Sequence, residues 1–174
     1  IPSVAKWKEE YEEIKNASKK KSDYEADNSG TTVEDEGASK KKIKSVLNRR
    51  RHLILPAMNQ KGLQNIFKMI SRSYSGDNFY RYPRVDYAML KKHNEGVIAA
   101  SACLGGVYAG NYWENRDTGP DAILSAMRDT TRKMQSIFGD RWYGELQWNN
   151  IPEQHELNRY IIQMHQEFGI DLIS

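Results

Sequence analysis

The side chains best suited to bind a metal ion or attack a substrate are one cysteine, Cys103, and four histidines, His52, His93, His155 and His165. No two histidines stand four residues apart, so no pair can share one helix face as metal ligands. HxH, HExxH, CxxC and the phosphate-binding GxxxxGK[ST] pattern do not occur in the sequence. These residues must therefore be judged by the elements that would position them.

Cys103 and His52 differ from the others because each lies next to a predicted strand. Cys103 follows the apolar run 96–101, and functional residues of α/β folds collect where strands end. A thiolate there could ligate Zn²⁺ or attack a carbonyl, whereas a lone cysteine is more often a small buried hydrophobe. His52 opens the apolar run 52–57, where a structural role is the commoner one. On the residues alone, both roles stay open.

From His52 onward, apolar spacing predicts alternating strands and helices. The predicted strands are 52–57, 96–101, 142–147 and 170–173, and the predicted helices are 63–74, 87–93, 121–138 and 152–168. Strands separated by helical crossovers indicate parallel βαβ units, in a doubly wound sheet or a barrel. The predicted fold class is α/β.

The first third of the chain has a different composition. The whole chain has 174 residues, 39% hydrophobic and 28% charged, with a mean hydropathy of −0.79 and a net charge of +3. Residues 1–51 hold 13 Lys or Arg and 10 Asp or Glu, so they carry that entire excess. Only four of the 25 residues 18–42 are hydrophobic, too few to offset the entropy of ordering them. We expect residues 1–51 to be a charged, largely disordered insertion with a short helix at 6–17.

Basic triplets in this segment could contact nucleic acid through phosphates. The candidate residues are Lys40, Lys41, Lys42, Arg49, Arg50 and Arg51. An acidic stretch precedes them, which favours a solvated loop over a basic binding face.

Several classes of protein are excluded or disfavoured by the sequence. No apolar run approaches the roughly 20 residues that cross a bilayer, so we expect no membrane contact. One cysteine cannot form an internal disulfide, which favours a reducing compartment and predicts a cytoplasmic location. The chain begins Ile1-Pro2 and stops within its last predicted strand, so we expect a domain truncated at both ends.

A set of motifs after His52 occurs in a family-like order. They are HLIL at 52–55, GLQN at 62–65, YPRVD at 82–86, NEGVIAASACLGG at 94–106, FGDRWYGELQ at 138–147 and IPEQ at 151–154. Together they resemble the PHP (polymerase and histidinol phosphatase) domain of the bacterial-type DNA polymerase III α subunit, phage-encoded versions included. The resemblance covers residues 52–174, which would form the central part of that domain.

This resemblance implies a distorted (β/α)7 barrel with a metal cluster at the carboxyl ends of its strands. It makes His52 and Cys103 metal ligands and Glu145 an outer residue that orients a ligand. The implied ion is Zn²⁺ or Mn²⁺, and the implied activity is a 3′→5′ exonuclease or phosphoesterase, or a degenerate scaffold without activity. Two ligands cannot hold a cluster, so we expect no catalytic residue and no activity in this chain alone.

The resemblance also implies what the complete protein does. It would be a DNA-directed DNA polymerase, a nucleotidyltransferase of DNA replication that uses primer-template DNA, dNTPs and Mg²⁺ in a palm domain absent from this chain. A proofreading exonuclease subunit and a sliding clamp are further implied partners. Two alternatives stay open: a stand-alone PHP phosphoesterase, and a non-catalytic interaction module that uses the charged N-terminal segment.

Overall fold

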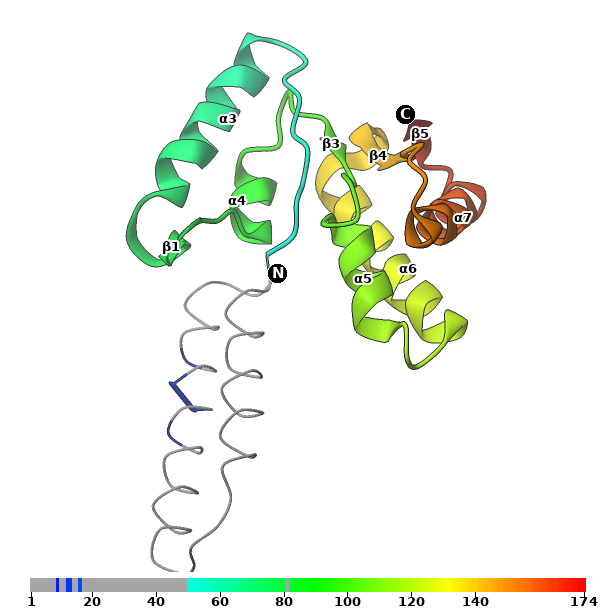
Figure 1. Ribbon diagram of the computed structural model, residues 1–174. Helices are drawn as coiled ribbons and strands as arrows, with labels where there is room; N and C mark the ends of the chain where they lie inside the picture. The colour runs from blue at the N-terminus through cyan, green and yellow to red at the C-terminus, as the bar shows by residue number, and fades with distance from the viewer. Residues whose placement is uncertain (1–8, 10–11, 14–15, 17–49, 81) are drawn as a thin grey trace, which may run out of the picture. The chain divides into compact units, whose positions relative to one another are not determined.

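The computed structural model describes residues 9, 12–13, 16, 50–80 and 82–174 (Figure 1). The chain forms two compact units, residues 1–50 with 72–88 and residues 51–71 with 89–174. The second unit contains a parallel sheet and the helices that cover it.

The sheet has three strands, β3 (Ala99–Ala100), β4 (Trp142–Glu145) and β5 (Asp171–Ile173), in the order β3-β4-β5. Both pairs are parallel, with Ala100 opposite Tyr143 and Gly144 opposite Leu172. The predicted parallel βαβ units are thus confirmed, in a small sheet that does not close on itself within the described residues.

Three helices connect these strands. α5 (Val107–Asn115) and α6 (Pro120–Phe138) lie between β3 and β4, with the short η2 (Gly139–Arg141) after α6, and α7 (Pro152–Phe168) joins β4 to β5. Trp142 and Gly144 are buried on the helix-covered face of β4, whereas the alternate residues Tyr143 and Glu145 are half-exposed. Gly144 allows the close approach of α7, because a Cβ there would lie 2.6 Å from Cγ2 of Ile161.

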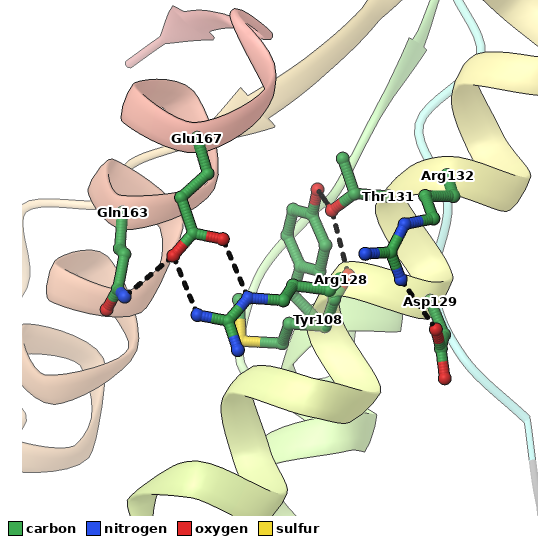
Figure 2. A network of polar contacts seen from close by, with 8 residues as sticks. Tyr108, Arg128, Asp129, Thr131, Arg132, Gln163 and Glu167 are labelled. Atoms are coloured by element: carbon green, nitrogen blue, oxygen red, sulfur yellow. Dashed lines mark hydrogen bonds and ion pairs between the residues drawn. The ribbon is translucent and has the colours of Figure 1, made fainter.

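A row of buried polar contacts fixes α5, α6 and β4 to one another, and Figure 2 shows its part between Tyr108 and Thr131. The Trp142 indole N–H donates to the Tyr108 hydroxyl at 3.0 Å, and that hydroxyl lies 2.7 Å from Oγ1 of Thr131. Thr131 in turn donates to the Met127 carbonyl at 2.8 Å. Burial raises the pKa of Tyr108 to about 12, so the hydroxyl stays protonated and keeps its place in this row of contacts.

A second contact joins α6 to α7 nearer the surface (Figure 2). The Arg128 guanidinium donates to both carboxylate oxygens of Glu167, at 2.7 and 2.8 Å, and Gln163 donates to the same carboxylate. The hydrogen bonds from Arg128 and then Gln163 lower the pKa of Glu167 to about 2.

The prediction of a regular parallel strand at 52–57 was wrong. This segment makes only isolated bridges, and two of them, from Ile54 to Ala100 and from Ala57 to Val97, run antiparallel to β3. Ile54 is 43% exposed, so the apolar run is not a buried core strand. Pro56 has no N–H for a ladder; its carbonyl accepts from Ile98 at 2.9 Å.

Helix α3 (Gln60–Ser73) confirms the predicted helix at 63–74. Unlike most amphipathic helices, it exposes most of its apolar residues. The Asn59 side chain caps it by accepting from the Gly62 N–H at 3.0 Å. Its buried side carries Gly62, Asn65 and Met69, whereas its apolar stripe is exposed. The exposed residues of that stripe are Leu63, Phe67 and Ile70.

The described part of the first unit is small. After η1 (Gly76–Asn78), β1 (Phe79–Tyr80) pairs antiparallel with β2 (Tyr82–Pro83). The rings of Tyr74 and Phe79 stack with their centroids 6.1 Å apart. α4 (Tyr87–Lys92), predicted as 87–93, begins in this unit.

The remaining predicted elements are confirmed as β3, β4, β5, α6 and α7, with shorter strands than the apolar runs. Most of the insertion expected at 1–51 lies outside the described residues, as do Lys40, Lys41, Lys42 and Arg49. Within the range 6–17, the described residues Glu9, Glu12, Glu13 and Asn16 are helical and exposed. Among the described helices, none has the length and apolar character needed to cross a bilayer.

Candidate metal centre

His52 and Cys103 meet at the carboxyl end of β3. Nδ1 of His52 lies 3.5 Å from Sγ of Cys103, although 50 residues separate them in the sequence. The backbone makes this contact: the His52 N–H donates to the Gly105 carbonyl at 2.8 Å, and a parallel bridge joins His52 to Gly106. The structure therefore brings together the two residues that the sequence analysis selected as ligands.

The turn that carries Cys103 has a tight backbone. Ala102 has a φ of 61°, which non-glycine residues seldom adopt, and the Gly106 N–H closes the turn on the Cys103 carbonyl at 2.7 Å. A Cβ at Gly105 would lie 3.0 Å from Nδ1 of His52, so the missing side chain leaves room for the imidazole ring. The Gly105 N–H also points at Sγ, at 3.4 Å.

The separation of the two side chains suits a tetrahedral ion. Zn–S and Zn–N bonds of about 2.3 and about 2.0 Å at a tetrahedral angle place sulfur and nitrogen about 3.5 Å apart. Imidazole nitrogen and thiolate sulfur are donors that Zn²⁺ accepts well, and a backbone N–H on the thiolate is a common outer contact of such sites. His52 is exposed and Cys103 half-buried, so solvent reaches the pair.

Glu145 lies at the end of the neighbouring strand. Its backbone N–H donates to Oγ of Ser101 at 2.9 Å, which ties the end of β4 to a residue two positions before Cys103. One carboxylate oxygen accepts from Gln147 at 2.8 Å, and the other, Oε2, is buried without a hydrogen-bond partner among the described residues. No hydrogen bond joins this carboxylate to His52 or Cys103, so its role as an orienting residue stays a prediction.

The other three histidines lie outside this pair. His155 is exposed on α7 and His93 is buried at the end of α4. Nδ1 of His165 lies 2.7 Å from the Ile170 carbonyl, where it secures the turn after α7. Across the described residues, no group of three or more His, Cys, Asp or Glu side chains could hold a metal ion.

The two described basic candidates are both engaged. The Arg50 guanidinium lies 3.8 Å from the centroid of the Tyr82 ring. Arg51 forms an ion pair with Glu114 at 2.5 Å and packs where a Cβ on Gly110 would overlap it. A nucleic-acid contact by these arginines stays a prediction.

Sequence reasoning missed two aromatic residues near this edge. α5 was not predicted, because Gly110 and several aromatic residues lower its helix propensity. As a result, the contact from the Trp113 indole N–H to the Leu104 carbonyl, 3.1 Å long and one residue past Cys103, was not foreseen. Trp148 follows β4 and is 75% exposed, and nothing in its local spacing signals this.

Comparison with known proteins identifies the family to which this chain belongs. The PHP domain family model matches residues 7–149, so the chain belongs to the PHP domain family. That match begins within the segment expected to be an insertion, and the proposed domain boundary at residue 52 stays a prediction.

The chain is similar to curated proteins named DNA polymerase III subunit alpha. It is 41% identical to the one from Aquifex aeolicus over 123 residues, 71% of this chain and 10% of that protein. The one from Helicobacter pylori strain 26695 is 34% identical over 145 residues, 80% of this chain and 11% of that protein. The Thermus aquaticus protein is 32% identical over 123 residues, 71% of this chain and 9% of that protein. The chain thus spans about a tenth of the length of these relatives.

Proposed function

We propose that this chain is a central part of the PHP domain of a DNA polymerase III α subunit, a DNA-directed DNA polymerase of DNA replication. The observation that carries the proposal is the family match over 7–149 together with the similarity to several DNA polymerase III α subunits. The complete protein would extend a primer on template DNA with dNTPs, using Mg²⁺ in a palm domain beyond this chain. A proofreading exonuclease subunit, a sliding clamp and a cytoplasmic location belong to the same proposal.

Within the PHP domain, His52 and Cys103 are the residues of this chain that would hold Zn²⁺ or Mn²⁺. When bound, such an ion polarises a phosphodiester and lowers the pKa of a bound water, which is the chemistry of 3′→5′ exonuclease or phosphoesterase activity. The Gly105 N–H would hold the thiolate in place, since it already points at Sγ at 3.4 Å. Glu145 would orient a ligand from the end of β4. The other ligands must come from outside the described residues.

A degenerate PHP domain that acts only as a scaffold is the second candidate. It is favoured by the lack of a third ligand beside His52 and Cys103 in the described part of the chain. The two candidates predict different sequences upstream: an active domain needs further His and acidic ligands there, including an HxH pair, whereas a scaffold does not.

The coding sequence on both sides of this chain tests the proposal. We expect an HxH pair upstream, a DxH motif soon after residue 174, and a long downstream region with the acidic residues of a polymerase palm. A stop codon shortly after the DxH motif would instead identify a stand-alone phosphoesterase. If the HxH pair is absent, the metal-dependent activity is wrong while the polymerase assignment stands.

A further inference from the structure

Trp148 is the most exposed large hydrophobic side chain among the described residues, at 75%. It lies in the loop 146–151, directly after β4, between Gln147 and the pair Asn149 and Asn150. A large apolar patch typical of a protein–protein contact would surround an aromatic residue with other apolar groups. Here the neighbours of Trp148 in the sequence are amide residues, and Ile151, 42% exposed, is the other exposed large hydrophobic residue of the loop.

Buried amides of α7 fix the loop on both sides of this indole. Asn158 donates to the Gln147 carbonyl at 3.0 Å and accepts from Gln154 at 2.9 Å, and Gln154 is fully buried. After the indole, the Ile151 carbonyl accepts from the N–H groups of Gln154 and His155 at 3.0 and 3.2 Å. The backbone on either side of Trp148 is therefore held before any ligand arrives, which lowers the entropy lost on binding.

The loop starts at the sheet edge that carries the candidate metal centre. β4 ends at Glu145, whose N–H donates to Ser101 at 2.9 Å, and Cys103 follows two residues after Ser101. β3 and β4 are parallel, so the loop and the Cys103 turn leave the sheet at the same edge. A DNA strand whose phosphodiester lay at His52 and Cys103 would thus have the Trp148 indole nearby, on the loop that follows β4.

We infer that Trp148 binds single-stranded DNA by stacking on one of its bases, and so positions the strand at this edge. The inference rests on the proposed function, which supplies DNA as the substrate class. Every base has a π face that an indole can cover, so this contact tolerates any sequence. Of the neighbouring amide residues, Asn150 is exposed, and its side chain can hydrogen-bond a base edge or the DNA backbone, which favours nucleic acid over a protein partner.

The test measures binding of the whole 174-residue chain to a labelled oligothymidylate by fluorescence anisotropy, without added metal. Removing one base-stacking contact by Trp148→Ala should weaken binding about 5- to 150-fold, the loss equivalent to about 1–3 kcal/mol per base. Trp148→Phe should retain most of the affinity, since phenylalanine still stacks. Phe67→Ala is the control, because it removes another exposed aromatic side chain, on α3, and it should bind as the wild type does.

Two further readouts separate stacking from a structural role. Thermal unfolding should be the same for Trp148→Ala and the wild type, because the side chain is exposed. Fully paired duplex DNA should bind no more weakly to Trp148→Ala than to the wild type. Wild-type affinity in Trp148→Ala, no binding by the wild type, or an equal Trp148 dependence for duplex DNA would each overturn the inference. The coding-sequence test involves no binding, so its failure is distinguishable from any of these.

Discussion

Helices α3 and α6 have similar apolar spacing but opposite environments. The apolar residues of α6, which include Ile123, Met127 and Met134, are buried against α5, α7 and the sheet. On α3 the apolar stripe is exposed, and the side that packs carries Gly62, Asn65 and Met69. Periodicity thus predicts that a helix forms and is amphipathic, whereas the rest of the fold decides which side is covered.

The second unit itself has one part with a buried core and one part that is more exposed. The segment β3–β5 with its helices has a closed core, with Trp142, Tyr108 and Phe138 almost fully buried. The segment 52–71 is joined to it by isolated bridges with their backbone hydrogen bonds, such as the pair between Ile54 and Ala100. The candidate metal centre takes one residue from each part, His52 and Cys103, so its geometry depends on how these two parts are joined.

The largest contrast is expected from one substitution made in both helices. Ile123 is 2% exposed in α6 and Ile70 is 50% exposed in α3. Ile123→Ala should lower the free energy of unfolding by about 2–5 kcal/mol, because it leaves a cavity in the core. Ile70→Ala should lower the free energy of unfolding by no more than about 1 kcal/mol. Urea unfolding of both variants measures this, and equal losses would contradict the difference between the two helices.

A methyl group on the packed side of α3 should be the next largest effect. A Cβ at Gly62 would lie 1.8 Å from the Gly96 carbonyl oxygen, which is backbone and cannot move aside alone. Gly62→Ala should therefore destabilise the protein by about 1–3 kcal/mol, although alanine is the better helix former. The exposed Gln64→Ala on the same helix is the control and should leave urea unfolding unchanged. A stabilised Gly62→Ala would show that this side of α3 is not packed.

The row of buried polar contacts in the core should be sensitive to one hydroxyl. Tyr108→Phe leaves the Trp142 N–H without its acceptor in a dry environment, at a cost of about 1–2 kcal/mol. The exposed Tyr74→Phe should cost almost nothing. The raised pKa of Tyr108, about 12, also predicts a loss of stability as pH rises from 10 through 12. If Tyr108→Phe had wild-type stability in thermal unfolding, these buried polar contacts would not stabilise the core.

The smallest expected effect is at the surface contact between α6 and α7. Arg128 lowers the pKa of Glu167 to about 2, so the carboxylate stabilises the fold above its unfolded pKa near 4.5. That contribution should be lost as pH falls from 4.5 through 2, and Glu167→Gln should abolish it. Melting temperatures measured over this pH range should converge for the two proteins at the acid end. The exposed Asp129→Asn is the control, and a constant gap across the range would contradict the linkage.

The sequence predicted more of the fold than of the candidate site. Long helices such as 121–138 and 152–168 follow from 3.6-residue periodicity and from the glycine that comes directly after each of them, Gly139 and Gly169, so their bounds were nearly right. The direction of 52–57 could not be predicted, because an apolar run does not say which strand it pairs with. His52 and Cys103 were selected by resemblance, and their contact depends on a backbone pairing between segments 50 residues apart. Trp148 was missed because exposure depends on the packing of α7.

The most direct test of the central claim, that His52 and Cys103 form a metal-ligand pair, is a titration of the whole chain with Co²⁺ as a stand-in for Zn²⁺. We expect a sulfur-to-cobalt absorption band that grows only with excess metal, because two ligands bind weakly. Cys103→Ser should abolish the band, His52→Ala should shift the titration to higher metal, and Glu145→Gln should leave the band in place. A wild-type chain with no band at large excess would contradict the pair. Tight binding of one equivalent would contradict the conclusion that this chain supplies only part of the site.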